Sequence, residues 1–272
     1  MVIRQLLEWG AAQLQGVADQ PMREARILFS FTSAMPIERI IVQMEDQVDE
    51  AAYRQAIAKR KTGCPVAYIT GQKEFYGLPF LVSEHVLVPR PDTETLVDYV
   101  INGDFEKTDI LDLCTGSGCI AISLAKHISG AEIDAVDISE KALDIAHENA
   151  KKNGVQERVQ GICHDIFEPF VPDKQYDVLV SNPPYIPQKD MDDLMADVRN
   201  FEPHLALAGG EDGLGFYRRI AHIAPWLLKE NGRVVLECGI GQAQDIAAMF
   251  AGKRVHLVND LRGIPRVVAA RF

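Results

Sequence analysis

From about residue 91 onward, apolar strand-like runs alternate with stretches of helical periodicity, and this alternation constrains the fold more than any other feature of the chain. The runs are DILDL (109–113), AEIDAV (131–136), VQGICH (159–164), YDVLVS (176–181), GRVVLE (232–237) and RVHLV (254–258). The alternation predicts a parallel sheet that helices cover on both faces. A last run, 265–272, follows its predecessor after a short turn at 259–263, and so short a link predicts an antiparallel pair.

The N-terminal part of the chain follows a different pattern. From residue 2 to about 62, apolar residues recur at helical spacing, interrupted by glycines and prolines, which predicts four short helices. Residues 66–90 change to β-branched and aromatic residues, which predicts a hairpin or connecting strands. We therefore expect an N-terminal helical domain (1–72), a linking hairpin (73–90) and an α/β domain (91–272).

The charge is unevenly distributed between these parts. Residues 1–80 carry nine Lys or Arg and nine Asp or Glu, so the whole formal net charge of −11 lies in residues 81–272. A net charge of this sign argues against a broad phosphate-binding surface, and we expect no direct nucleic-acid partner. The composition, 47% hydrophobic and 25% charged, is typical of a globular protein with a substantial core.

The cysteines and the N-terminal residues indicate the compartment. The five cysteines are odd in number and scattered, which is not a disulfide framework, and no ligand spacing predicts a metal site. The first residues have no secretory-leader pattern, and no stretch of about 18 apolar residues predicts a membrane span. We expect a soluble cytoplasmic protein with neither a metal nor a membrane partner.

A turn that contains glycine joins the run at 109–113 to a helix, and it consists of Cys114, Thr115, Gly116, Ser117 and Gly118. Glycines let the backbone approach a ligand closely, and a helix N-terminus offers unpaired N–H groups. Asp137 ends the next run, where its carboxylate can accept hydrogen bonds from both hydroxyls of a ribose. Together these features predict a nucleoside cofactor, whereas separately they are compatible with a tight turn and a helix cap.

Two observations refine the cofactor prediction. No third glycine follows Gly118, so the loop lacks the full G-x-G-x-x-G pattern of dinucleotide-binding loops, which favours S-adenosylmethionine, a cofactor without phosphate. HDIF (164–167) ends the third run, so that Asp165 can accept from an adenine amino group and Ile166 can pack on the ring. A simple capping role for Asp165 is equally compatible with the sequence.

The fourth run ends in the motif Asn182-Pro183-Pro184-Tyr185, at the edge where open α/β sheets bind ligands. The alternative is purely structural: the two prolines end the strand, and Tyr185 fills a gap in the packing. The motif suits methylation of a planar NH2 group, whose lone pair is delocalised. The Asn182 side-chain oxygen and the Pro183 carbonyl can accept its two N–H groups, while Tyr185 packs against its plane. The prolines hold these acceptors in place, which is preorganisation rather than general-base catalysis.

The motif NPPY alone is shared by methyltransferases that act on adenine, cytosine and glutamine amides. With its neighbouring segments, however, the chain resembles the peptide chain release factor glutamine methyltransferase (HemK/PrmC) family over almost its whole length. The segments are YITGQKEFYG (68–77), VPRPDTETL (88–96), DLCTGSG (112–118), SNPPYIP (181–187), EPHLALAGGEDGLGFYR (202–218) and DLRGIPR (260–266).

This resemblance implies a Rossmann-like class I methyltransferase sheet, mostly parallel with the last strand antiparallel, preceded by a small helical domain and a linking hairpin. It implies transfer of a methyl group from S-adenosylmethionine, leaving S-adenosylhomocysteine. The acceptor would be N5 of the glutamine in the Gly-Gly-Gln loop of class I peptide chain release factors, which the N-terminal domain would recognise. An amino methyltransferase acting on adenine or cytosine in nucleic acid is the alternative.

Carried over by position, the donor site comprises 114–118, Asp137, Ile166 and Asn182, and the glutamine site comprises 182–185. The segment 90–94 would line the active site, without an assigned role for each side chain. Two residues depart from the family pattern. Cys114 replaces a usual glycine, which the loop tolerates only if this position needs no positive φ. Ile166 replaces a commonly aromatic residue, which would weaken packing on adenine.

Overall fold

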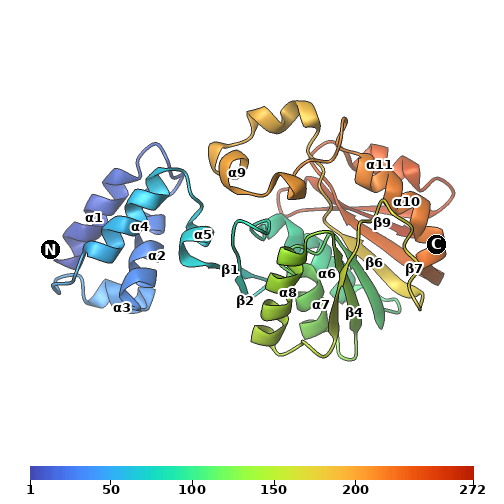
Figure 1. Ribbon diagram of the computed structural model, residues 1–272, viewed down its shortest axis with the longest axis horizontal. Coiled ribbons are helices and arrows are strands. Elements are labelled where there is room, and N and C mark those ends of the chain that lie inside the picture. The colour runs from blue at the N-terminus through green and yellow to red at the C-terminus, as the bar shows by residue number, and fades with distance from the viewer. The chain divides into compact units, whose positions relative to one another are not determined.

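The computed structural model describes residues 1–272 (Figure 1). The chain divides into two compact units, one comprising Met1–Gln72 with Met195–Phe201, the other Lys73–Leu194 with Glu202–Phe272. No sequence signal separated Met195–Phe201 from the α/β part of the chain. It groups with the first unit, where a Cβ at Gly63 would lie 3.5 Å from the Phe201 ring. The predicted domain boundaries, with the roles attached to them, stay a prediction.

Short helices form the first unit, and the structure confirms the four that were predicted before residue 62. They are α1 (Ile3–Gln13), α2 (Pro21–Ser33), α3 (Ile37–Val42) and α4 (Ala51–Lys61). Their apolar faces form one core, in which Leu6, Phe29 and Tyr53 are fully buried. The late segment adds α9 (Ala196–Phe201).

The prediction of extended structure was wrong for the beginning of 66–90, where the chain forms the helix α5 (Val66–Thr70). Pro65 precedes the first turn with φ −55°, and Gly71 ends the helix in the left-handed region with φ 70°. Val66 and Ile69 pack against the core of the first unit, so tertiary burial overrides their β propensity. The predicted hairpin follows as β1 (Gln72–Phe75) and β2 (Leu78–Leu81).

The second unit is built on a sheet of seven strands in the order β5-β4-β3-β6-β7-β9-β8. The strands are β3 (Asp109–Leu113), β4 (Glu132–Asp137), β5 (Val159–Cys163), β6 (Tyr176–Ser181), β7 (Leu228–Glu237), β8 (Arg254–Asn259) and β9 (Pro265–Arg271). The ladders from β5 to β7 are parallel, and β9 is antiparallel to both β7 and β8. The predicted mostly parallel sheet with an antiparallel last strand is therefore confirmed.

Helices cover both faces of this sheet (Figure 1). Along β3, Ile110 belongs to the core under α6, α7 and α8, whereas Leu111 belongs to the core under α10 and α11. The covering helices are α6 (Glu94–Asn102), α7 (Cys119–His127), α8 (Glu140–Asn153), α10 (Gly215–Leu227) and α11 (Ala243–Met249). The short helices η1 (Pro91–Thr93), η2 (Gln188–Asp193) and η3 (His204–Ala206) lie in the connections. None of the helices is both long and apolar enough to cross a membrane.

The register places the ends of three strands together. Leu113, the last residue of β3, lies opposite Val136 of β4 on one side and Ser181 of β6 on the other. The segments that follow these strands therefore leave the sheet side by side, at the point where the strand order reverses. Open α/β sheets bind ligands at this point.

Candidate functional site

A cavity of about 330 Å³ lies at this edge of the sheet. Its walls come from the segments after β3, β4, β5 and β6, together with parts of 84–93 and 203–206. This volume lies within the range of small-molecule sites, about 300–1,000 Å³. The predicted site residues that line it are Cys114, Thr115, Gly116, Ser117, Asp137, Asp165, Ile166, Asn182 and Pro184. Gly118, Pro183 and Tyr185 are not among its lining residues.

The turn after β3 contains three residues in the left-handed region, namely Cys114 (φ 61°), Gly116 (φ 56°) and Gly118 (φ 77°). The expectation that the loop tolerates Cys114 only at a position without positive φ was wrong. Such a conformation costs a residue with a Cβ about 1–2 kcal/mol. The turn tolerates it because neighbouring bonds hold its backbone: Thr115 N donates to the Val136 carbonyl at 3.0 Å, and Gly118 N donates to the Thr115 carbonyl at 2.9 Å.

Glycine is required at the two positions of the turn, Gly116 and Gly118, for different reasons. A Cβ at Gly116 would meet no atom within 4 Å, so this backbone faces open space, and the glycine is required by its φ. At Gly118 a Cβ would come within 2.9 Å of Ile122 and 3.0 Å of Ala146, so this glycine also allows α7 and α8 to approach each other. The backbone facing the cavity is thus Gly116, while Gly118 serves packing.

Asp137 is fixed by backbone groups on both of its oxygens. Oδ2 accepts from Gly116 N at 2.8 Å, and Oδ1 accepts from Ser139 N at 2.9 Å. Burial raises the pKa of this carboxyl, and these backbone bonds oppose the shift. Since each carboxylate oxygen can accept two hydrogen bonds, Asp137 keeps acceptor capacity toward the cavity. The cap of α8 is Ser139, whose hydroxyl accepts from Ala142 N at 3.2 Å.

The segment after β5 presents an aromatic ring that the sequence analysis did not assign. Asp165 Oδ1 accepts from Phe167 N at 2.9 Å, which turns the chain locally. Both Ile166 and Phe167 line the cavity, but Ile166 is only 5% exposed and packs in the core, whereas Phe167 is 50% exposed. Its ring meets that of Phe216 edge to face, with centroids 5.0 Å apart. An aromatic residue one position after Ile166 was the signal available in the sequence.

Segments distant in the sequence hold the NPPY motif. Asn182 Nδ2 donates to Thr93 Oγ1 at 3.2 Å, and the Tyr185 carbonyl accepts from Gln242 Nε2 at 2.9 Å. A Cβ at Gly209 would lie 2.8 Å from the Pro184 carbonyl, so this glycine allows the two backbones to touch. Burial raises the pKa of Tyr185 to about 12, so its phenol stays protonated at neutral pH.

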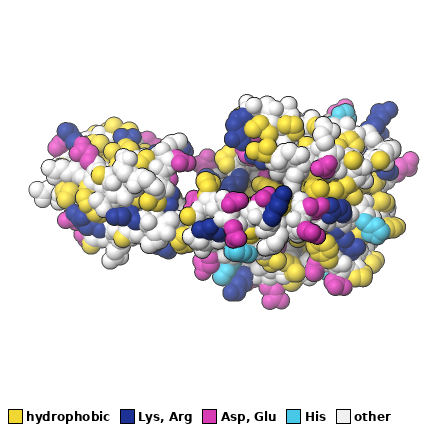
Figure 2. Space-filling model, turned by 90° about the horizontal axis from the view of Figure 1, so that it is seen from above, with side chains coloured by type: hydrophobic (Ala, Val, Ile, Leu, Met, Phe, Trp, Pro, Cys, Tyr) yellow, Lys and Arg dark blue, Asp and Glu magenta, His cyan; other side chains and the backbone are white.

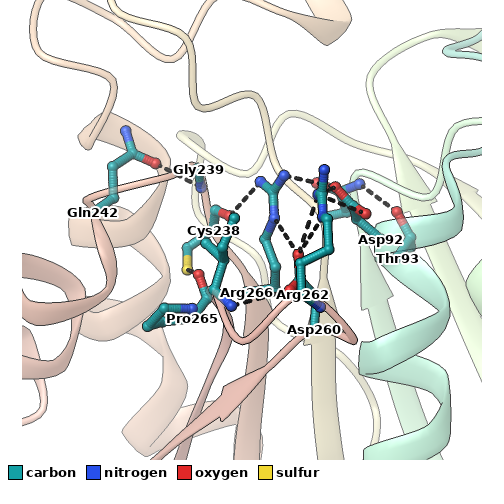
Figure 3. Close-up of polar contacts among 11 residues, drawn as sticks. Asp92, Thr93, Cys238, Gly239, Gln242, Asp260, Arg262, Pro265 and Arg266 are labelled. Atoms are coloured by element: carbon teal, nitrogen blue, oxygen red, sulfur yellow. Dashed lines mark hydrogen bonds and ion pairs between the residues drawn. The ribbon is translucent and has the colours of Figure 1, made fainter.

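Next to Thr93, which contacts Asn182, lies a cluster of charged side chains from η1 and the segment 260–266 (Figure 3). Asp92 of η1 accepts from Arg266 Nη2 at 2.6 Å and from Arg262 Nη2 at 3.0 Å. Arg262 also pairs with Asp260, and Arg266 Nη1 donates to the Cys238 carbonyl at 3.4 Å. Thus the motifs 88–96 and 260–266, which lie at opposite ends of the second unit's sequence, meet behind the NPPY segment.

Glu237, the last residue of β7, is 2% exposed and belongs to the same region. Burial raises the pKa of its carboxyl to about 7, while a hydrogen bond with the Thr93 side chain and the charge of Arg266 oppose this shift. No group of three or more His, Cys, Asp or Glu side chains is arranged to hold a metal ion. The site is therefore an apolar cavity with a few fixed amide, hydroxyl and carboxylate groups.

Family models match both the N-terminal and the α/β part of the chain, and similar proteins match it over nearly its full length. Residues 5–71 match the family model "PrmC N-terminal domain", and residues 91–201 match "Methyltransferase small domain". The Release factor glutamine methyltransferase of Geobacter sulfurreducens is 37% identical over 99% of this chain and 96% of its own length. That of Koribacter versatilis is 36% identical over 100% and 99%. The Bifunctional methyltransferase of Rickettsia typhi is 37% identical over 98% of this chain, but the chain spans only 56% of its length.

Solved structures show the same fold at lower identity. A methyltransferase from Pyrococcus furiosus superposes with a TM-score of 0.53 and 17% identity, covering 80% of this chain and 96% of that chain. The hMettl16 catalytic domain superposes with a TM-score of 0.54 and 17% identity, covering 79% and 81%. The α/β unit therefore has a methyltransferase fold.

Proposed function

The chain belongs to the release factor glutamine methyltransferase family, and from this premise we propose that it methylates N5 of the glutamine in the Gly-Gly-Gln loop of class I peptide chain release factors. The observation that carries the proposal is the match to relatives of this name over nearly the full length of both chains, including the N-terminal unit. Methyltransferases in general share the α/β unit, so the N-terminal match favours this acceptor over others.

We propose S-adenosylmethionine as the methyl donor. The cavity has a suitable volume, an open backbone at Gly116, and carboxylates at Asp137 and Asp165. Asp137 would accept from the ribose hydroxyls and Asp165 from the adenine amino group, while Phe167 supplies an aromatic face that Ile166 lacks. When bound, the donor would supply an electrophilic methyl group on a sulfonium sulfur.

The chain's own residues would prepare the acceptor amide. The nitrogen of a glutamine amide is a weak nucleophile because its lone pair is delocalised into the carbonyl. Asn182 Oδ1 and the Pro183 carbonyl would accept its two N–H groups and rotate the lone pair toward the methyl group. The buried prolines keep both acceptors rigid, so that little reorganisation is needed during transfer. After transfer the nitrogen would lose one proton to solvent water, which restores the neutral amide.

We further propose that the first unit recognises the release factor. Its net charge is close to zero, unlike that of the second unit, and α3 exposes Ile41 and Val42 to solvent. Exposed apolar side chains grouped on one short helix are suited to a protein partner.

The direct test combines purified protein, isotope-labelled donor and an unmodified release factor. Mass spectrometry of the Gly-Gly-Gln peptide should find one added methyl group, and a release factor with Gln→Glu in that loop should remain unlabelled. An unlabelled glutamine together with labelled adenine or cytosine in DNA or RNA would replace the proposal by the nucleic-acid alternative. The charge argues against that outcome, since acidic and basic side chains are interspersed on the face of the second unit seen in Figure 2.

A further inference from the structure

Thr93 lies between the NPPY motif and the charged cluster of η1 and 260–266. It is the last residue of η1, its side chain is 1% exposed, and it lines the cavity. Its Oγ1 accepts from Asn182 Nδ2 at 3.2 Å, across 89 residues of sequence. Its side chain also forms a hydrogen bond with the Glu237 carboxyl group. Thr93 therefore connects Asn182, which is proposed to bind the glutamine amide, to the buried acid Glu237.

The chemistry of these three side chains sets the direction of the hydrogen bonds. A threonine hydroxyl has a single proton, and an ionised carboxylate can only accept. When Glu237 is ionised, Thr93 donates to it, which leaves Thr93 only as an acceptor toward Asn182. An amide has its donors on nitrogen and its acceptors on oxygen. Asn182 consequently turns Nδ2 toward Thr93, and its Oδ1 stays available on the other side of the amide.

The position of Thr93 is itself fixed by the ion pairs of its neighbour Asp92. Its neighbour Asp92 is held by Arg266 at 2.6 Å, and Arg266 is only 8% exposed (Figure 3). Arg266 is held in turn by the Cys238 carbonyl and by Asp260. A buried guanidinium with several acceptors restricts the motion of η1 more than an exposed ion pair would. The motif 260–266 thus supports the site through these contacts, although none of its residues lines the cavity.

We propose that Thr93 is a positioning residue for methyl transfer, because its hydroxyl orients the Asn182 amide so that Oδ1 faces the acceptor NH2 group. This inference rests on the proposed function for the identity of the acceptor. If the amide were reversed, Nδ2 would point at the two N–H groups of the acceptor, and donors would oppose donors. Thr93 would thus act on the rate of transfer through Asn182, and the affinity for the donor would depend on it little.

A pair of matched variants tests the proposal. Thr93→Val keeps the shape and removes the hydroxyl, whereas Thr93→Ser keeps the hydroxyl and removes a methyl group. We expect Thr93→Val to lower kcat about 10- to 100-fold, the range typical of a lost orienting contact, and Thr93→Ser to stay within about threefold of wild type. Calorimetric titration should give S-adenosylmethionine affinities within about twofold for all three proteins, and thermal melting should show that both variants are folded.

Each result has a definite consequence. A Thr93→Val protein with wild-type kcat overturns the inference, and so do equal losses in the Val and Ser variants, because these would report packing alone. If the wild-type protein labels a nucleobase instead of the glutamine, the proposed function fails. The Val and Ser comparison on that NH2 group would then still decide whether Thr93 orients Asn182.

Discussion

The turn after β3 and the motif after β6 lie on neighbouring strands at the same edge of the sheet, yet they are held in different ways. The turn is fixed by close neighbours in sequence, as in the bond from Thr115 to Asp112 and that from Gly116 to Asp137, 3 and 21 residues apart. The NPPY motif is fixed by residues 89 and 57 positions away, Thr93 and Gln242. The proposed donor side is thus built from local contacts, whereas the acceptor side depends on long-range contacts.

The largest expected effect is on the acceptor side. Asn182→Ala should lower kcat about 10²- to 10³-fold, because it removes one preorganised partner of the acceptor NH2 group. Single-turnover methylation of the release factor measures this loss. Asn102→Ala, at an exposed position at the end of α6 in the second unit, serves as the control and should retain the wild-type rate. Undiminished turnover in Asn182→Ala would remove this residue from the mechanism and erase the proposed contrast between the two sides.

On the donor side, Asp137→Ala should act mainly on affinity. Hydrogen bonds to a charged group are worth about 1.5–3 kcal/mol, so we expect S-adenosylmethionine to bind roughly 10- to 100-fold more weakly. The change also releases Gly116 and Ser139, while Asp137→Asn keeps an acceptor and should lose less. Calorimetric titration decides the matter, and an unchanged affinity would contradict the ribose assignment.

The pH dependence of kcat should separate an effect of Glu237 on the reaction from a general loss of stability. With a pKa of about 7, Glu237 gains its proton as the pH falls below neutrality. A protonated carboxyl can donate to Thr93, whose own proton then becomes available to the Asn182 oxygen. We therefore expect kcat to decrease several-fold between pH 8 and pH 6, as about 1 unit of pH on either side of a pKa covers most of a titration. Glu237→Gln should remove this dependence.

The stability of the folded protein should depend on pH in the opposite direction to kcat. Folding raises the pKa of Glu237 from its ordinary value of 4.5, so the folded state binds this proton more tightly, and the contribution of this group to stability increases as the pH falls from above 7 toward 4.5. The charged groups that face it are Arg266, Arg90 and Asp92. The neutral groups coupled to it are Tyr185, Tyr217, Cys119 and Cys238, whose raised pKa values keep them protonated in this range. A melting temperature that falls in parallel with kcat would contradict this account.

The smallest effect concerns the backbone of the turn itself. Cys114→Gly should relieve the positive φ and stabilise the fold by about 1 kcal/mol relative to Cys114→Ala, which loses the thiol but keeps the Cβ. The difference between the two variants in urea-induced unfolding isolates the backbone term from the loss of packing. Equal free energies of unfolding would show that the conformation at this position carries no cost.

Much of the fold follows from the sequence because periodicity reports burial directly. The runs 109–113 and 176–181 coincide with β3 and β6, whose residues are almost all buried, as expected for strands covered on both faces. The helix at 66–70 was not foreseen, because its partly buried β-branched residues pack against the core of the first unit and only these tertiary contacts decide between helix and strand. The positive φ of Cys114 was likewise hidden, since a local rule that favours glycine was overridden by the bonds around the turn.

By itself, the sequence determined the alternation of strands and helices, the antiparallel end of the sheet and the identity of the motifs, since these depend on side-chain type and local spacing. Only the tertiary structure decided which motifs meet. It brought Thr93 to Asn182 across 89 residues, paired Arg266 with Asp92, and placed the exposed ring of Phe167 at the cavity beside the buried Ile166. The physical reason is that a hydrogen bond or a ring contact depends on distance and direction in space, and neither is encoded in the spacing of a motif along the chain.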